Sequence, residues 1–347
     1  MQTNYLFRAL LFIAAVLPGA RAGAAESAPA GAEIVEVKKI WDAGGHNAFT
    51  DLLRWQGRWW CTFREAVGHV GGDGVIRVIM SADGATWESA AALAEKDVDL
   101  RDPKLSVAPD GRLMLVCGGS IYLGTKELKG RRPRVSFSKD GRSWTEPVKI
   151  LAEGDWLWRV TWHEGTAYGV SYRSVKTATG SGEEVFLCKS SDGVTWSVVV
   201  KMDVPDRPNE TTLRFLPDGR MVAMVRREAS SKLGWFGEAR APYTQWTWHE
   251  SNLRWGGPDL VVLPDGRWIA GTRIYAKTQG GPAEKTGTII ASVDKFQLTP
   301  LVTLPSGGDT SYSAFVWHDG LLWTSYYSSH EGKTAIYLAK VRLPAAK

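Results

Sequence analysis

A polar turn containing glycine recurs six times along this chain of 347 residues, each time between two runs in which apolar and polar residues alternate. Each such segment is typical of a β-hairpin. Successive turn glycines are separated by 54, 54, 54, 47 and 54 residues, and a period this regular predicts a repeat architecture. The six glycines are Gly57, Gly111, Gly165, Gly219, Gly266 and Gly320.

Each repeat holds one hairpin and two further strand-like runs, which matches a four-stranded propeller blade. The third repeat shows this pattern in runs 156–162, 167–172, 184–189 and 196–202, and the helical period is absent throughout. The sequence therefore predicts an all-β fold, a six-bladed β-propeller of four-stranded antiparallel blades, over residues 31–347. Only one strand-like run follows the sixth hairpin, so we expect residues 34–41 to complete that blade and join the two chain ends.

The first residues are typical of a secretory signal peptide. A basic start ending at Arg8 precedes an apolar run over residues 9–17 and a small-residue cleavage site, Ala20-Arg21-Ala22. We expect residues 1–22 to be removed and the mature chain to be periplasmic or secreted. The apolar run is about half the length that a membrane span needs, so no membrane span is expected.

Composition narrows the classes of partner. The formal net charge is +5, and Lys and Arg are scattered among acidic residues without a basic run, which argues against nucleic acid as a partner. The three cysteines, Cys61, Cys117 and Cys188, are expected to be buried free thiols. The seventeen Trp residues are expected mainly to fill a β core, although some could also form a platform for a sugar.

A second repeated element lies inside the first three repeats, at residues 81–87, 138–144 and 190–196. Each copy reads Ser-x-Asp-Gly-x-Ser/Thr-Trp. We expect the Asp to accept hydrogen bonds from turn N–H groups, the Gly to adopt the left-handed conformation, and the Trp to pack back between strands. These segments resemble the Asp boxes of the sialidase (neuraminidase) superfamily, which also occur in propellers that are not sialidases.

Alternating strand direction sorts polar residues by face. The start of the first strand and the end of the second strand of a blade lie on one face, opposite the hairpin turns. Strand ends carry charged residues in any case because they meet solvent, but equivalent offsets from the turn glycine favour a shared site. The residues expected on this face are Arg64, Arg226 and Arg273, seven residues after a turn glycine; Asp102 and Glu210, nine before; Tyr312, eight before; His69 and Asp73 in a blade-one loop; and Arg159 of blade three.

Residues 31–347 also resemble sialidases in their order of motifs. Segment 208–211 followed by Arg226-Arg227 is similar to the family's glutamate strand and second arginine, and segment 308–313 resembles its tyrosine segment. Segment 63–65 is similar to the first-arginine motif, with Glu65-Ala66 in place of the usual Ile-Pro, and Arg273 takes the third position by order. The resemblance implies an exo-glycosidase that removes terminal sialic acid, or a related anionic sugar, from glycoconjugates without a cofactor or metal.

The resemblance also implies roles for these residues. Arg64, Arg226 and Arg273 would hold the sugar carboxylate by bidentate hydrogen bonds, and Tyr312 would be a nucleophile whose proton Glu210 accepts. A neutral phenol avoids the repulsion that a carboxylate nucleophile would meet there. The acid that protonates the leaving oxygen is either Asp73 or Asp102.

Two other function classes stay open. One is a polysaccharide lyase, in which Tyr312, His69 and His330 exchange protons while arginine neutralises a uronate; the family scheme itself has no role for His69. The other is a propeller that binds carbohydrate without turnover, which is favoured if the acid is absent from the site. In the leading interpretation, Arg159 and His69 are expected to bind substrate together with the three arginines. The sequence does not indicate an oligomeric state.

Overall fold

The computed structural model describes residues 1, 31–71, 74–124, 127–177, 180–275 and 286–346. The chain divides into two units, Met1–Ala30 and Gly31–Lys347, and every described strand belongs to the second unit. The predicted signal peptide lies outside the described residues apart from Met1, as does Asp73.

Residues 31–346 form six four-stranded antiparallel sheets, as the sequence predicts. Blades 1 and 2 contain β2 (His46–Trp55), β3 (Arg58–Ala66), β4 (Val75–Ser81), β5 (Glu88–Leu93), and β6 (Asp99–Val107), β7 (Leu113–Leu123), β8 (Glu127–Ser138), β9 (Val148–Lys149). Blades 3 and 4 contain β10 (Trp156–His163), β11 (Thr166–Thr177), β12 (Gly180–Ser190), β13 (Ser197–Met202), and β14 (Pro208–Phe215), β15 (Met221–Arg227), β16 (Leu233–Ala239), β17 (Thr247–Arg254). Blades 5 and 6 contain β18 (Gly256–Val262), β19 (Trp268–Ile274), β20 (Gly287–Asp294), β21 (Gln297–Thr303), and β22 (Thr310–His318), β23 (Leu321–Ser328), β24 (Ala335–Arg342), β1 (Glu33–Trp41).

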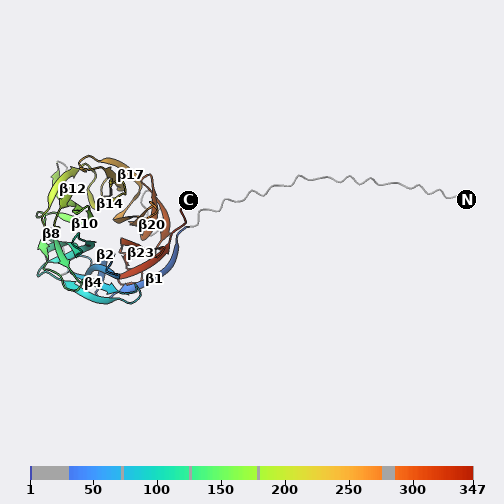
Figure 1. Ribbon diagram of the computed structural model, residues 1–347, viewed down its shortest axis with the longest axis horizontal. Helices are drawn as coiled ribbons and strands as arrows, with labels where there is room; N and C mark the ends of the chain where they lie inside the picture. The colour runs from blue at the N-terminus through green and yellow to red at the C-terminus, as the bar shows by residue number, and fades with distance from the viewer. Residues whose placement is uncertain (2–30, 72–73, 125–126, 178–179, 276–285, 347) are drawn as a thin grey trace. The chain divides into compact units, whose positions relative to one another are not determined.

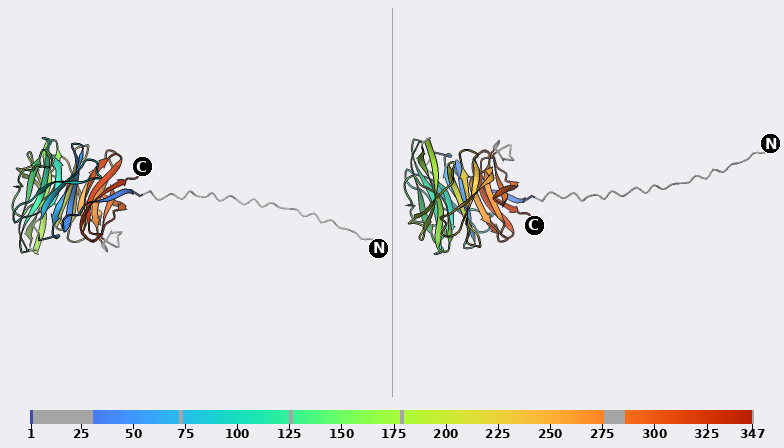
Figure 2. Two further views of the ribbon diagram at one scale, coloured as in Figure 1. Left: turned by 90° about the horizontal axis from the view of Figure 1, so that it is seen from below. Right: turned by 90° about the horizontal axis from the view of Figure 1, so that it is seen from above.

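The six sheets surround a common centre (Figure 1). The innermost strands contact one another in the order β2, β6, β10, β14, β18, β22 and back to β2, which closes the ring. The outermost strand of blade 6 is β1, paired antiparallel with β24, so the predicted closure by residues near the N-terminus is confirmed. In side view the strands run between two faces (Figure 2). We call the face on which the innermost strands begin the site face, and the opposite one the hairpin face.

The three Asp boxes have the structural role that the sequence predicts. In the second copy, Asp140 Oδ1 accepts hydrogen bonds from the backbone N–H groups of Arg142 at 2.8 Å and Ser143 at 2.7 Å. Trp144 Nε1 donates to the carbonyl of Gly141, whose φ is 72°. A Cβ at Gly141 would lie 2.1 Å from the Trp60 ring, so the box packs tightly against blade 1.

The core is apolar and aromatic between adjacent blades. Trp59, Trp158 and Trp255 are among its largest fully buried side chains, which confirms that Trp fills the β core. The three cysteines are buried and free, as expected. Within the described ranges, no helix has the length and apolar character needed to cross a membrane.

The innermost strands are irregular near the site face. Each pairing with the second strand shifts register there, as between Ser311 and Ala314 of β22 and between Arg101 and Lys104 of β6. Asp102 and Tyr312 lie inside these irregularities with φ values of 50° and 55°, a region that non-glycine residues seldom adopt. Bulges of this kind redirect a side chain and recur beside functional sites.

Candidate active site on the site face

Tyr312, Glu210 and Arg226 form a continuous hydrogen-bonded group, contributed by β22, β14 and β15. The Tyr312 hydroxyl donates to Glu210 Oε1 at 2.5 Å, and Arg226 Nη1 lies 2.7 Å from the same oxygen. Tyr312 and Glu210 are 7% and 5% exposed, so the phenol hydroxyl and the carboxylate are both largely shielded from water. Three residues separated by up to 102 positions in the chain therefore meet at one carboxylate oxygen.

The electrostatics of this group assign a protonation state to each member. Burial raises the pKa of Glu210, but the charge of Arg226 and the hydrogen bonds from Tyr312 and Gly257 outweigh it, so the pKa lies below its ordinary value. Burial, with the neighbouring charge of Glu210, raises the pKa of Tyr312 well above its ordinary value. Near neutral pH the phenol is neutral and hydrogen-bonded to an ionised carboxylate.

Gly257 provides the space in which these two side chains meet. Its N–H donates to Glu210 Oε2 at 2.9 Å. Its φ is 60°, and a Cβ at this position would lie 2.5 Å from Cδ2 of Tyr312. A residue with a side chain would therefore displace the tyrosine ring, which the sequence pattern alone does not reveal.

Arg273 lies beside the same tyrosine, as the offset predicts. Its Nε donates to the carbonyl of Thr310 at 2.7 Å, its Nη2 donates to the hydroxyl of Tyr327 at 3.0 Å, and its Cζ is 5.9 Å from the centroid of the Tyr312 ring. Burial opposes its charge, but neighbouring phenols, led by Tyr327, raise its pKa despite repulsion from Arg226. Two of the three predicted arginines therefore lie together at Tyr312.

Arg64 is placed differently from the expectation. Its side chain is fully buried, with Nε and Nη2 donating to Asp99 at 2.6 and 3.0 Å and Nη1 donating to the carbonyl of Gly68 at 2.7 Å. A guanidinium with no exposed surface cannot reach a substrate carboxylate in this arrangement. The offset placed Arg64 on the correct strand, but Asp99 of the next blade holds it inside the protein.

Arg159 is likewise withdrawn into the protein. Its Nη1 donates to Asp51 at 2.8 Å and its Nη2 is 3.6 Å from Asp259, so it links β10 to the innermost strands of blades 1 and 5. The side chain is 8% exposed and both carboxylates are buried. These contacts indicate that Arg159 links strands across the centre of the ring, whereas the sequence predicted that it binds substrate.

Asp102 has the environment of an acid. It is 7% exposed, and burial raises its pKa, with a further contribution from the charge of Glu210 and opposition from Arg101. Its Oδ1 has no hydrogen-bond partner among the described residues. A carboxyl group whose pKa is raised by burial is suited to proton donation. The other candidate acid, Asp73, lies outside the described residues.

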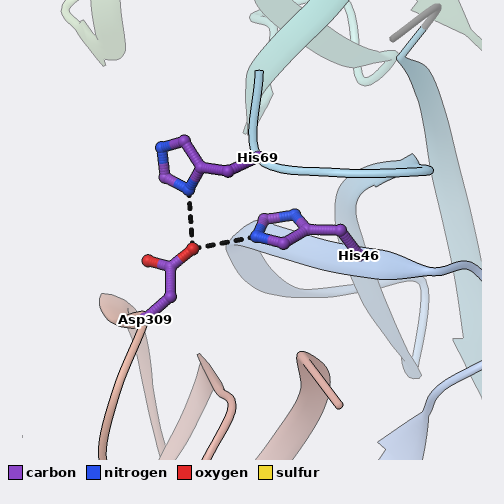
Figure 3. Close-up of side chains that lie close together, drawn as sticks. All are labelled: His46, His69 and Asp309. Atoms are coloured by element: carbon purple, nitrogen blue, oxygen red, sulfur yellow. Dashed lines mark hydrogen bonds and ion pairs between the residues drawn. The ribbon is translucent and has the colours of Figure 1, made fainter. Parts of the chain in front are cut away.

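His69 belongs to a cluster that the sequence did not reveal. Its Nδ1 is 2.6 Å from Asp309 Oδ2, and His46 Nε2 is 2.8 Å from the same oxygen (Figure 3). Phe49 connects the cluster to the tyrosine, since its ring centroid is 5.3 Å from that of His69 and 5.1 Å from that of Tyr312. Asp309 lies three residues before Tyr312 in segment 308–313. This proximity to the predicted nucleophile was the only sequence signal that could have placed Asp309 at the site.

Comparisons with known proteins identify the fold. No family model and no curated protein matches the sequence. A solved protein of unknown function from Dyadobacter fermentans is similar with a TM-score of 0.77 and 19% identity, over 90% of this chain and 99% of that one. A Trypanosoma rangeli sialidase in complex with sialic acid has a TM-score of 0.66 and 12% identity, over 86% of this chain and 55% of that one. An α-L-arabinanase from Penicillium chrysogenum has a TM-score of 0.66 and 15% identity, over 88% and 98%.

The class of structure follows from these comparisons. The chain is a six-bladed β-propeller of the architecture shared by sialidases and arabinanases, which confirms the predicted fold. It spans about half the length of the Trypanosoma sialidase chain. The structural neighbours include enzymes for different sugars, so any choice of substrate has to come from the side chains on the site face.

Proposed function

We propose that this protein is a retaining exo-glycosidase of the sialidase type, which removes a terminal anionic sugar, with sialic acid as the first candidate. The contact of the Tyr312 hydroxyl with Glu210 Oε1 at 2.5 Å, beside Arg226, is the observation that supports it most strongly. A phenol and a carboxylate this close form a nucleophile and its base. Solved structures of the same fold include a sialidase in complex with sialic acid.

The proposed reaction has two steps. In the first, Tyr312 Oη attacks the anomeric carbon as Glu210 takes the phenol proton, and the bond to the leaving oxygen breaks as Asp102 protonates that oxygen. In the second, water replaces the tyrosine on the anomeric carbon, giving one proton to Asp102 while the phenol regains its proton from Glu210. Asp102 and Glu210 return to their initial states, so protons balance over one turnover.

The carboxylate of the sugar would be held by Arg226, Arg273 and Arg101. Arg101 replaces Arg64 in this scheme because hydrogen bonds among the described residues engage only its Nη1, with the carbonyl of His69 at 2.9 Å and with Asp99 at 3.2 Å. Its Cζ is 5.1 Å from the ring of Phe49, which packs on Tyr312. A guanidinium with free N–H groups can bind a carboxylate by charge-assisted hydrogen bonds.

A panel of sialosides and neutral glycosides, with product analysis, tests this proposal. The wild-type chain should release an acidic sugar, and Tyr312→Phe should lose most turnover while still binding the product sugar, because only the nucleophilic oxygen is removed. Arg101→Ala should raise KM for the anionic substrate more than it lowers kcat, and Arg64→Met should leave KM unchanged. Equal rates on a substrate without the carboxylate, or full turnover by Tyr312→Phe, would contradict the proposal.

A polysaccharide lyase is the second candidate, favoured by one observation. The His69 side chain is 48% exposed, is held by Asp309 through Nδ1, and packs on the aromatic ring that also contacts Tyr312. The other ring nitrogen of His69 has no hydrogen-bond partner among the described residues, and an oriented imidazole of this kind can exchange a proton. Uronate-containing polysaccharides would then give products with a carbon–carbon double bond, detected by a rise in ultraviolet absorbance, whereas hydrolysis gives none.

A further inference from the structure

Three donor atoms converge on the site face from segments far apart in the chain. His46 begins β2, His69 lies between β3 and β4, and Asp309 directly precedes β22. His46 Nε2, His69 Nδ1 and one Asp309 carboxylate oxygen all lie within 4.8 Å of one another. Figure 3 shows both imidazole rings directed at the same carboxylate oxygen, His46 from the start of β2 and His69 from the loop between β3 and β4, with the carboxylate approaching from blade 6.

We propose that His46, His69 and Asp309 bind a divalent transition-metal ion of the zinc type. Two imidazole nitrogens and one carboxylate oxygen form a donor set that Zn²⁺ accepts at about 2.0–2.2 Å, with a further position left for water or a ligand. The resemblance to sialidases implied no metal, so this site departs from that expectation. It is independent of the proposed glycosidase activity.

The geometry needs only a small adjustment to hold the ion. Tetrahedral coordination at these bond lengths separates donor atoms by about 3.3 Å. The two oxygen–nitrogen distances, 2.8 Å to His46 and 2.6 Å to His69, would therefore widen by about 0.5 Å and about 0.7 Å. Rotation of His69, whose side chain is 48% exposed, can widen its own distance to Asp309. His46 is 9% exposed and stays fixed, so its distance widens through a small shift of the Asp309 side chain, which is 27% exposed.

Neighbouring residues of blade 6 orient the Asp309 carboxylate. Asp309 Oδ1 accepts a hydrogen bond from the Tyr327 hydroxyl at 2.9 Å, and that hydroxyl accepts one from Arg273 Nη2 at 3.0 Å. The Asp309 N–H donates to Ser329 Oγ at 2.8 Å. Supporting hydrogen bonds of this kind orient metal-binding carboxylates in proteins, and they leave Oδ2 directed at the two imidazoles.

Metal binding competes with the two hydrogen bonds that now join the histidines to Asp309. In the metal-free state each imidazole directs an N–H at Oδ2, and an ion replaces both of these protons. Zn²⁺ gains strong bonds to imidazole nitrogen, whereas Ca²⁺ and Mg²⁺ prefer sites built from oxygen alone. The site should therefore select Zn²⁺ and Co²⁺ over Ca²⁺ and Mg²⁺.

Direct titration with metal alone tests the proposal. The protein should be purified without a histidine tag, stripped with a chelator, and titrated with Zn²⁺ by calorimetry and with Co²⁺ by visible absorption, which reports coordination geometry. We expect one ion per chain and intense Co²⁺ bands of a four-coordinate nitrogen and oxygen site. His69→Ala should abolish both signals, and this exposed side chain can be removed without loss of the fold.

Two further variants sharpen the result. Tyr327→Phe should weaken Zn²⁺ binding by roughly 10–100-fold, because it removes the support of the carboxylate and no ligand. His163→Ala is the matched control, since that histidine stacks on Phe215 with ring centroids 3.9 Å apart and should leave Zn²⁺ binding unchanged. Absence of stoichiometric Zn²⁺ binding by the wild-type chain, or equal binding by a folded His69→Ala variant, would overturn the proposal and leave a purely hydrogen-bonded cluster.

Discussion

Two arginines occupy the same register of the propeller and differ in their carboxylate partners and in what surrounds them. Arg64 and Arg226 both stand seven residues after a turn glycine, near the end of the second strand of a blade. Arg64 and its partner Asp99 are 0% and 1% exposed, whereas Arg226 and its partner Glu210 are 16% and 7% exposed. Glu210 also accepts the hydroxyl of Tyr312, but Asp99 accepts only from arginines among the described residues.

This difference separates a pair suited to a structural role from a pair suited to proton transfer. A buried, bidentate ion pair that is fully satisfied holds two blades together, and it can release neither partner without leaving a buried charge. A carboxylate shared between an arginine and a neutral phenol can accept a proton, because the hydrogen bond already follows the path of the transfer. Equivalent register therefore fixes where an arginine lies, and its partner fixes what it does.

The largest expected effect is on turnover, in Glu210→Gln. The amide keeps the size of the side chain but cannot accept the proton of Tyr312, so kcat should fall about 10²–10⁴-fold on the substrate identified from the glycoside panel. Steady-state kinetics measures the fall, and a binding assay with the product sugar checks that the site is intact. Turnover at the wild-type rate would show that the more exposed Arg226–Glu210 pair (the open pair) is as structural as the fully buried Arg64–Asp99 pair (the closed pair).

A second expected effect concerns the acid, in Asp102→Asn. Loss of proton donation should lower kcat about 10²–10⁴-fold on a natural substrate, but far less on an aryl glycoside whose leaving group needs no proton. A uniform loss on both substrates would remove Asp102 from this role. The control is Glu210→Gln, which should affect both substrates, because the nucleophile needs its base whatever the leaving group.

The same variant should also change how stability depends on pH. Burial raises the pKa of Asp102 above its ordinary value near 3.8, so the folded state binds the proton more tightly than the unfolded state. This contribution is fully present below pH 3.8 and is lost as the pH rises through the raised value. Urea unfolding over this range should show the wild-type chain losing stability relative to Asp102→Asn as the pH rises.

Much of the fold could be predicted because it follows from periodic signals. The spacing of the turn glycines fixed six blades, and the single strand after the sixth hairpin predicted the closure that β1 makes with β24. Offsets from those glycines placed Tyr312, Glu210 and Arg226 together, because strand direction converts sequence position into a face of the sheet.

The contacts between blades could not be predicted in the same way. The burial of Arg64 depends on Asp99 of the next blade, and the cluster of His46 with Asp309 joins residues 263 positions apart across the closure. Neither pairing produces a repeated spacing in the sequence, because each occurs once in the propeller. Each also depends on the direction of a side chain at a local irregularity of the strand. The left-handed conformations of Asp102 and Tyr312 are likewise invisible in an alternating apolar pattern.

The closed pair gives a further prediction, an effect on stability. Arg64→Met leaves the carboxylate of Asp99 buried without its bidentate partner, and this should lower the free energy of unfolding by about 3–5 kcal/mol. Urea unfolding measures the loss, and the double variant with Asp99→Asn should recover part of it, because the unpaired carboxylate is gone although Arg101 loses its ion pair with Asp99. In the folded variant KM should stay near the wild-type value, whereas Arg226→Met should raise KM with a smaller loss of stability.

The smallest effect is expected at the hairpin face, where charge serves turn geometry alone. Asp140→Ala removes an acceptor for two backbone N–H groups at 2.8 and 2.7 Å and should lower the free energy of unfolding by about 1 kcal/mol, with kcat and KM unchanged. Hydrogen bonds from Ser143 and Arg142 lower the pKa of Asp140 to about 2, so this contribution is present above its ordinary value near 3.8 and is lost as the pH falls toward 2. Asp140→Asn retains the acceptor oxygen without the charge, so it should keep most of the stability and lose this acid dependence. A change in KM in either variant would mean that the two faces of the propeller are coupled. The Asp boxes would then also influence the site, and the comparison of the open and closed pairs would have to take them into account.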